Sequence, residues 1–401
     1  KNILFTSVVG PYGTLSEWSR YKNPMSLLTN QVTRGQLYYQ VEMFCNTWAF
    51  DVFATNINAN TAILDFPSVK QLEKVLGTGK WDRIGVSAII PNFDALLKTY
   101  QVIRSILPNT PIDIGGHIVN DDEVIQELKD KMLEIYPKEK FKTYVSCTDV
   151  DTDDHKGVTF VKMDGLDYYA KLKGFGPKKM HSFFAPLSIA SIEKRVMGLS
   201  VSKTSSGLII TDVGCPMKCD FCSTSHKFKG KFISFINTAE DVLKVADAHA
   251  EQGRTEMFIM SENFSLDHKR ALELLKLMEE QKKAYSFNVF SSANALMKLG
   301  VENIVKLGYC FVWIGLEEST GKTYNKMDNI DLKKLVKELQ AHGVEVLGST
   351  IIGFEHQTME DINREIEHAL SYNCVYNQFM LFMPVPGTAL WDRMKKEGKI
   401  K

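Results

Sequence analysis

The run Gly207-Leu-Ile-Ile-Thr-Asp-Val213 leads directly into Gly214-Cys-Pro-Met-Lys-Cys-Asp-Phe-Cys-Ser223. The first part is the kind of short apolar stretch that forms a buried strand. The second part spaces Cys215, Cys219 and Cys222 as C-x₃-C-x₂-C. Three closely spaced thiolates suit an iron–sulfur cluster better than other common ligands do. Because a 4Fe–4S cluster has four irons, three protein ligands would leave one iron open for chemistry.

Half of a zinc site is the alternative interpretation of this spacing. Structural zinc usually takes four ligands, often from two paired knuckles. The sequence has no second C-x₂-C pair close to the first, and His226 is one of few other candidate ligands nearby. The seven cysteines are odd in number and three of them cluster, which argues against a disulfide framework and favours a reducing, cytosolic setting.

The composition is that of a soluble globular protein with room for two or more domains. The chain has 401 residues, of which 44% are hydrophobic and 24% are charged. The 48 basic residues balance the 48 acidic ones, which argues against general binding to nucleic acid or to a membrane surface. No apolar run reaches the ~18 residues of a membrane span. The first residues do not resemble a signal peptide, and the initial Lys1 indicates a trimmed chain. We therefore expect a cytoplasmic protein without an integral membrane segment.

The second half of the chain repeats one pattern six times, an apolar strand-like run followed by a helix-like run. Four of the intervening segments place apolar residues at i, i+3, i+4 and i+7 or close to it, which is the helical period. Thr238, Asp331 and Thr358 are expected N-caps, and Gly253 and Gly343 are expected to follow helix ends. The expected strands are Leu208–Val213, Glu256–Met260, Tyr285–Ser291, Cys310–Leu316, Val344–Ile352 and Asn377–Met383.

Apolar strands that alternate with helices predict an α/β fold with a parallel sheet covered by helices. Six units favour a partial (β/α)6 barrel over a closed barrel of eight. The first half alternates less regularly, with strands expected at 61–66, 82–88 and 111–116 and helices at 68–76, 93–107 and 121–133. This pattern predicts a doubly wound, Rossmann-like domain. We expect three parts: an α/β domain at 1–150, a linker and connecting segment at 151–205, and the barrel at 206–401.

The cysteine motif, placed after the first strand of a six-unit β/α barrel, resembles that of the radical S-adenosylmethionine (SAM) superfamily. Phe221, just before the last cysteine, also matches the superfamily pattern. The resemblance implies that Cys215, Cys219 and Cys222 hold a 4Fe–4S cluster, whose fourth iron is chelated by the amino and carboxylate groups of SAM. One-electron reduction then cleaves SAM to a 5′-deoxyadenosyl radical, which abstracts a hydrogen atom from a substrate.

Two later segments match the superfamily at the ends of the second and fourth strands. Met260-Ser-Glu-Asn-Phe264 lies where the superfamily places polar groups for the amino end of SAM, which implies Glu262 as a contact. Glu317 matches the position that meets the ribose or the methionyl part of SAM in many relatives, with Glu318 as the alternative. A loop carboxylate without a ligand is the other interpretation of Glu262.

Two further segments match at the ends of the fifth and sixth strands. Gly348, Ser349 and Gly353 lie in the motif that borders adenine in the superfamily, where glycine lets the backbone approach a ligand closely. Tight packing is the alternative reason for each glycine. Phe382-Met-Pro-Val-Pro-Gly-Thr388 resembles the P-x-P-G-T run of several branches. The matching segments follow in the expected order from about Ser206 to Leu390.

The N-terminal domain resembles that of the cobalamin-binding subset of this superfamily. Ser87 matches a serine near the cobalamin tail, and Gly115 and Gly116 match the turn over which the nucleotide tail passes. The sequence lacks the D-x-H-x-x-G motif whose histidine ligates cobalt in domains of the methionine synthase type, and His117 does not stand in that context. The resemblance therefore implies cobalamin without the usual histidine ligand. A domain that shapes the substrate site or is vestigial is the alternative.

Together these features predict an enzyme, a cobalamin-dependent radical SAM methyltransferase that acts on an unactivated carbon. Cyclisation, rearrangement or C–C bond formation without methyl transfer is the alternative within the same chemistry. A non-catalytic protein that binds a cluster or cobalamin is the alternative from another class, although an electron carrier has no need of a SAM pocket. The expected partners are an electron donor such as flavodoxin or ferredoxin and a small-molecule, lipid or peptide substrate, with no nucleic acid.

Overall fold

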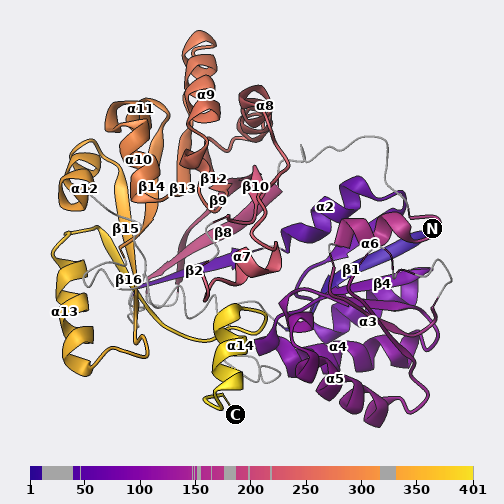
Figure 1. The fold of residues 1–401 in the computed structure, drawn as a ribbon. Helices are drawn as coiled ribbons and strands as arrows, with labels where there is room; N and C mark the ends of the chain where they lie inside the picture. Colours follow the sequence, from indigo (N-terminus) through magenta and orange to yellow (C-terminus); the bar gives the residue numbers. More distant parts are fainter. Residues whose placement is uncertain are drawn as a thin grey trace. The chain divides into compact units, whose positions relative to one another are not determined.

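The computed structural model describes residues 1–10, 39–45, 47–146, 148, 150, 155–163, 165–175, 187–196, 199–216, 219–316 and 331–400. The chain divides into two compact units (Figure 1). Unit 1 comprises Lys1–Thr29 and Val41–Ala185, and unit 2 comprises Asn30–Gln40 and Pro186–Lys401. Across the residues that the model describes, no helix has the combination of length and apolarity needed to cross a membrane.

Unit 1 is built on a six-stranded sheet in the order β3-β1-β4-β5-β7-β6, in which every pair is parallel. The strands are β1 (Asn2–Ser7), β3 (Asn60–Leu64), β4 (Arg83–Ser87), β5 (Ile112–Gly115), β6 (Phe141–Tyr144) and β7 (Val158–Val161). The helices are α2 (Trp48–Asn56), α3 (Val69–Thr78), α4 (Phe93–Ile106), α5 (Asp122–Ile135) and α6 (Gly165–Lys171).

Helices cover both faces of the unit 1 sheet. Leu72 of α3, Tyr100 of α4 and Leu128 of α5 belong to one buried core with the strands. Phe50 of α2 and Tyr168 of α6 belong to a separate core on the other face. Each such fully buried apolar side chain contributes roughly 1.5–3 kcal/mol to folding. The two cores confirm the predicted doubly wound domain.

Strand β1 lies between β3 and β4, so the order of the sheet reverses at β1. In doubly wound sheets, ligands bind outside the carboxyl ends of the strands at such a switch point. Ser7 and Ser87 are paired across the ends of β1 and β4, and Ser87 is paired with Gly115 at the end of β5. The predicted residues Ser87, Gly115 and Gly116 therefore lie at or next to the ligand-binding edge of this sheet.

Unit 2 contains seven strands of one sheet, in the order β16-β15-β14-β13-β12-β9-β8. The strands from β9 to β16 are parallel, and β8 runs antiparallel to β9. The strands are β8 (Leu187–Val196), β9 (Leu199–Ile210), β12 (Glu256–Met260), β13 (Ser286–Phe290), β14 (Tyr309–Gly315), β15 (Glu345–Ile352) and β16 (Tyr376–Leu381). The division between the two units falls within strand β2 (Tyr39–Cys45), between Gln40 and Val41. The six parallel strands lie close to the six expected positions.

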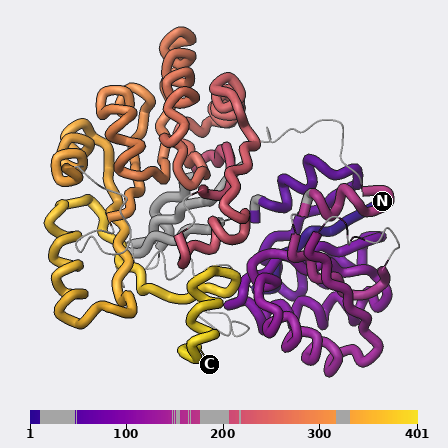
Figure 2. The backbone as a smooth tube through the Cα atoms, viewed as in Figure 1, coloured from indigo at the N-terminus to yellow at the C-terminus, as the bar shows by residue number. Residues whose placement is uncertain are grey.

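Helices cover the outer face of this sheet in chain order (Figure 2). They are α8 (Ala239–Ala250), α9 (His268–Glu280), α10 (Ala293–Leu299), α11 (Val301–Lys306), α12 (Leu332–Ala341) and α13 (Met359–Leu370). One continuous core holds Val242, Leu274 and Leu335 from these helices against Val289 and Val312 from the strands. This arrangement confirms the partial β/α barrel.

The predicted helix boundaries depend on capping, and the caps form as expected. The side chains of Thr238, Asp331 and Thr358 each accept a hydrogen bond from the backbone N–H three residues later. Gly253 and Gly343 follow helix ends with φ of +77° and +83°, in the left-handed region that favours glycine.

The structure divides the chain at different positions from those expected for the segment 151–205. Strand β7 and helix α6 lie in unit 1, where β7 pairs with both β5 and β6. Strands β8 and β9 form a long antiparallel hairpin that extends the barrel sheet. Strand β7 has only four residues, and no helix separates the strands of the hairpin, so periodicity in the sequence did not mark these elements.

We predict that acid destabilises unit 2 through His249, a fully buried residue of α8. Burial lowers the pKa of His249, the nearby charge of Arg254 lowers it further, and the Leu208 carbonyl raises it. A histidine with a lowered pKa binds fewer protons when folded than when unfolded. Stability is therefore full above the unfolded pKa of about 6.5 and falls as the pH drops through it, by at most ~1.4 kcal/mol per pH unit.

Urea unfolding at pH 7.5 and pH 5.5 measures this effect. His249→Gln keeps a donor for the Leu208 carbonyl, which lies 3.0 Å from the imidazole Nε2, and cannot titrate. We expect the wild-type midpoint to fall more between the two pH values than that of the variant. Equal losses in both proteins would contradict the assignment.

Candidate functional site

The three cysteines lie on an excursion of the chain that leaves the end of β9 and is closed at its base. Strand β10 (Asp212–Val213) pairs antiparallel with β11 (Ile233–Ser234), so residues 214–232 form a closed loop. Helix α7 (Ser223–Lys227) begins directly after Cys222 within this loop. We call residues 211–236 the cysteine excursion.

The backbone at Gly214 leaves no room for a side chain. Its φ is +88°, and a Cβ atom there would lie 2.2 Å from the carbonyl oxygen of Lys231. Any side chain would therefore push apart the two chain segments that enter and leave the excursion. Gly214 immediately precedes Cys215. The close approach of the two chain segments therefore fixes the backbone position from which the Cys215 side chain extends.

The three cysteines lie on one loop, where short-range hydrogen bonds tie their backbone. Cys215, Cys219 and Cys222 are all partly exposed. The Cys222 N–H donates to the Cys219 carbonyl at 3.1 Å, and the Ser225 hydroxyl donates to the Cys215 carbonyl at 2.8 Å. Among the described residues, no three Cys, His, Asp or Glu side chains converge as ligands of one metal ion. The thiolates of a 4Fe–4S cluster each bind a different iron, so they surround one group but lie farther apart than the ligands of a single ion.

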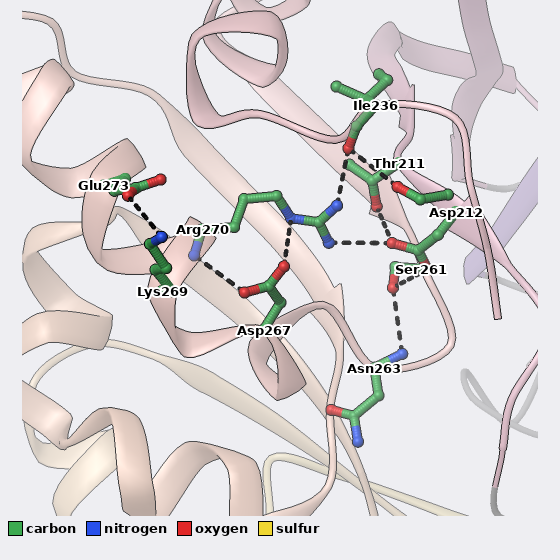
Figure 3. Close-up of polar contacts among 10 residues, drawn as sticks. Thr211, Asp212, Ile236, Ser261, Asn263, Asp267, Lys269, Arg270 and Glu273 are labelled. Atoms are coloured by element: carbon green, nitrogen blue, oxygen red, sulfur yellow. Dashed lines mark hydrogen bonds and ion pairs between the residues drawn. The ribbon is translucent and has the colours of Figure 1, made fainter.

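A buried carboxylate, Asp212, ties the start of the excursion to the end of β12 (Figure 3). Its Oδ1 accepts from the Ser261 hydroxyl at 2.5 Å, and its Oδ2 accepts from the Thr211 hydroxyl at 2.7 Å. Arg270 of α9 completes the set, with its Nη2 donating to the same Oδ2 at 3.1 Å. Asp212 is 1% exposed and Arg270 is 4% exposed, so the charges compensate each other inside the unit.

Polar contacts continue from this network to the end of the next strand. The Asn263 amide donates to the Ser292 hydroxyl at 2.9 Å, and its carbonyl accepts from the Ser291 hydroxyl at 3.1 Å. The Asn263 N–H lies 3.3 Å from the Ser261 hydroxyl oxygen. The carboxyl ends of β9, β12 and β13 are therefore joined by one chain of hydrogen bonds.

Glu262 lies between these residues and keeps an exposed surface. Burial of its carboxyl raises its pKa, a hydrogen bond with Thr224 opposes that rise, and the negative charge of Asp212 adds to it. Thr224 belongs to α7, two residues after Cys222. The predicted carboxylate thus sits beside the cysteine excursion, where a cationic ligand group would be favoured. Glu317 and Glu318 lie outside the described residues.

The predicted fifth-strand residues differ in what surrounds them. At Gly348 a Cβ atom would lie 2.2 Å from Cδ1 of Leu316 and 3.0 Å from the Cys374 sulfur, so tight packing explains this glycine. Ser349 points to the opposite face and donates to Gln378 of β16 at 3.1 Å. Gly353 has φ of +84°, and its N–H donates to the Gln357 side chain at 2.7 Å.

Aromatic side chains line the face of the barrel sheet that α8 to α13 do not cover. Phe258 and Phe290 pack edge to face with their ring centroids 5.1 Å apart. Trp313 continues the row, 5.0 Å from Phe290. All three are half-buried. This inner face offers an apolar wall on the side where Ser349 also points.

The last segment of the chain contacts the cysteine excursion. Thr388 caps helix α14 (Ala389–Lys396), and the Leu390 N–H donates to the Asp220 carbonyl at 3.0 Å. Phe221 packs edge to face on Phe382, with the centroids 6.2 Å apart. The predicted P-x-P-G-T run therefore lies against the loop that carries the cysteines.

In unit 1 the predicted residues Ser87, Gly115 and Gly116 come together. A Cβ atom at Gly116 would lie 2.3 Å from the Ala88 carbonyl oxygen and 3.1 Å from the Ser87 hydroxyl oxygen, and its φ is +90°. At Gly115, by contrast, a Cβ atom would meet no atom within 4 Å. Gly116 thus joins two strand ends, while Gly115 leaves open space above the backbone that an elongated ligand group could fill. His117 follows them and is exposed.

Sequence reasoning missed the buried charged network on the other face of unit 1. Arg83 donates to Asp113 at 2.6 Å, and the Tyr168 hydroxyl donates to the same oxygen at 2.8 Å. These residues fasten α6 to β4 and β5 and lie toward the amino ends of those strands, away from the carboxyl ends where Ser87 and Gly115 lie. We interpret the network as structural.

Comparisons with known proteins find similar sequences and a similar fold. A model of the radical SAM superfamily matches residues 209–369, which confirms the predicted resemblance to that superfamily. An uncharacterised methyltransferase of Pyrococcus horikoshii is 30% identical over 194 residues, 46% of this chain and 41% of that protein. The hopanoid C-2 methylase of Rhodopseudomonas palustris is 24% identical over 212 residues, 50% of this chain and 40% of that protein. The chain spans about two fifths of the length of these curated relatives.

A solved structure shares the fold of nearly the whole chain. The radical SAM methyltransferase TsrM from Kitasatospora setae, with cobalamin and a [4Fe-4S] cluster bound, gives a TM-score of 0.59 at 12% identity, covering 99% of this chain and 78% of that one. The same enzyme with tryptophan and a SAM analogue gives a TM-score of 0.61, covering 99% of this chain and 76% of that one. At this identity the likeness shows the fold alone.

We predict that Gly214→Ala lowers the iron content of the reconstituted protein at least fivefold, because the new Cβ atom collides with the Lys231 carbonyl. Gly253→Ala is the matched control, since Gly253 has a similar φ of +77° but no atom within 4 Å of its Cβ position. Iron per chain and the visible absorption of the cluster provide the measurement. Equal iron content in the two variants would contradict a role for this close approach.

Proposed function

We propose that this chain, which carries a radical SAM domain, is a methyltransferase that uses a 4Fe–4S cluster, SAM and cobalamin to methylate an unactivated carbon. The observation that carries the proposal is the cysteine excursion, which presents three cysteines at the carboxyl end of the first barrel strand with Glu262 beside them. The names of the relatives, which include a hopanoid C-2 methylase, support methyl transfer over other radical outcomes.

Each cysteine would ligate one iron, leaving the fourth for the amino and carboxylate groups of SAM. When bound, the cluster supplies the electron that cleaves SAM to a 5′-deoxyadenosyl radical. Glu262 would hold the ammonium end of SAM through its partly desolvated carboxylate, with Thr224 orienting that carboxylate. The hydrogen bond from Ser349 to Gln378 lies on the inner face of the barrel sheet, which helices α8 to α13 do not cover.

The aromatic row on the inner face supports a role in keeping water from the reacting centre. Phe258, Phe290 and Trp313 offer apolar surface and no strong acceptor for a reactive radical. Exclusion of water from a closed site prevents side reactions of reactive intermediates. We propose a small-molecule, lipid or peptide substrate for this surface and a flavodoxin or ferredoxin as the electron donor.

Unit 1 supports cobalamin as the second cofactor through the open space above Gly115. That space lies at the carboxyl edge of a doubly wound sheet, beside the switch point between β1 and β4. Ser87 lies within the same group of strand ends and offers a hydroxyl to a polar tail. The solved relative of the same fold was determined with cobalamin bound.

We predict that the reconstituted protein, given SAM and a strong reductant, forms 5′-deoxyadenosine. Cys215→Ala removes one iron ligand and should abolish product to below 1% of wild type, as measured by liquid chromatography and mass spectrometry. Cys374→Ala is the control, because Cys374 is buried beside Gly348 and away from the excursion. The assay is run with and without candidate substrates, and a wild-type protein that forms none in either case contradicts the proposal.

We predict that Gly115→Leu fills the space proposed for the cobalamin tail and reduces retained corrin at least tenfold. Gly77→Leu is the matched control, since Gly77 also has no atom within 4 Å of its Cβ position but lies in α3. Protein at ~10 µM is incubated with cobalamin and desalted, and its visible spectrum is recorded. Retention at that concentration requires a dissociation constant in the micromolar range or below. Methyl transfer through cobalamin is ruled out if wild-type protein retains none.

A further inference from the structure

One side chain holds both ends of the cysteine excursion. Arg270 donates through Nη2 to the Asp212 carboxylate in β10 at 3.1 Å. Through Nη1 it donates to the Ile236 carbonyl, just beyond β11, at 2.8 Å. Figure 3 shows the guanidinium lying between these two partners. The segment that leaves β9 and the segment that returns from the cysteines are thus fixed to the same planar group.

The surroundings make this contact rigid. Arg270 is 4% exposed, and its guanidinium lies 5.0 Å from the centre of the Phe264 ring. Asp267, the N-cap of α9, lies 3.8 Å from the guanidinium Nε. A buried guanidinium with a compensating carboxylate and a carbonyl acceptor has one favourable orientation. The position of the excursion therefore follows the position of α9.

The contact between Arg270 and Asp212 is connected to Glu262 in two ways. Asp212 accepts a hydrogen bond from Ser261, which is the neighbour of Glu262 in sequence. The Glu262 carboxyl in turn interacts with Thr224, inside the excursion. Arg270 thereby constrains both the loop that carries the cysteines and the loop that carries Glu262.

We propose that Arg270 is a positioning residue for the methionyl group of SAM. By closing the base of the excursion and anchoring Ser261 through Asp212, it holds the loop of the three cysteines and the Glu262 carboxylate in a fixed relation, and these are the two parts of the site that the amino-acid end of SAM would meet together. This inference rests on the proposed function. Lysine cannot replace arginine here, because one ammonium does not present two donors in a fixed plane to both Asp212 and Ile236.

The test compares Arg270→Lys with wild type. We expect the variant to fold and to hold a cluster, since Lys keeps the positive charge beside Asp212. Its affinity for SAM, measured by equilibrium dialysis of the reconstituted protein, should fall at least tenfold. The change that SAM causes in the electron paramagnetic resonance spectrum of the reduced cluster should be weakened or lost. Hydrogen exchange without cofactors should speed up in residues 211–236 and 261–263.

Arg104→Lys is the matched control in unit 1. Arg104 is also 4% exposed, donates to the Glu139 carboxylate at 2.5 Å and to the Thr110 carbonyl at 2.7 Å, and belongs to helix α4. We expect it to lose stability without losing SAM affinity. SAM affinity and spectral response within twofold of wild type in Arg270→Lys would overturn the proposal, as would equal losses in both variants. A wild-type protein that binds no SAM would instead overturn the proposed function.

Discussion

Parallel pairing of neighbouring strands brings their carboxyl ends to one edge of a sheet, and both candidate sites depend on this constraint. In unit 2 it brings the cysteine excursion beside Ser261, Glu262 and Asn263. In unit 1 it brings Ser87 beside Gly115. Right-handed crossovers through helices leave the loops at this edge free to carry chemistry while the helices cover the faces. The fold thus fixes where ligands bind, and the loops determine which ligands.

Polar groups buried at this edge have to be compensated, and the way they are compensated shapes the site. Asp212 accepts hydrogen bonds from Ser261, Thr211 and Arg270. A buried charge whose partner is removed destabilises a protein strongly, and the three donors restrict where the Asp212 carboxylate can lie. Glu262 differs because its carboxyl is partly desolvated and feels the charge of Asp212. A cationic ligand beside the Glu262 carboxylate would therefore offset the cost of its charge.

Local patterns in the sequence predict much of this structure. The six barrel strands, the caps at Thr238, Asp331 and Thr358, and the doubly wound first unit follow from periodicity, capping and turn chemistry, which act over a few residues. The cysteine spacing likewise locates the candidate cluster site within one loop. Such signals are readable because the physical interactions that produce them are local.

Other features depend on contacts that no local pattern reveals. Arg270 lies 58 residues from Asp212 in sequence, and nothing around it distinguishes it from a surface arginine of an amphipathic helix. The glycine at 348 fits a ligand motif in sequence, but its missing Cβ makes room for Leu316 and Cys374. The short strand β7 escaped prediction because four residues between loops carry too little periodicity.

The central claim is that three cysteines hold a 4Fe–4S cluster with one iron open to SAM. Mössbauer spectroscopy of protein reconstituted with ⁵⁷Fe, recorded with and without SAM, tests it most directly. The account predicts that a cubane cluster forms and that SAM changes the isomer shift of one iron while the other irons keep theirs. A protein that binds zinc in place of iron, or a cluster in which no iron responds to SAM, would contradict the account.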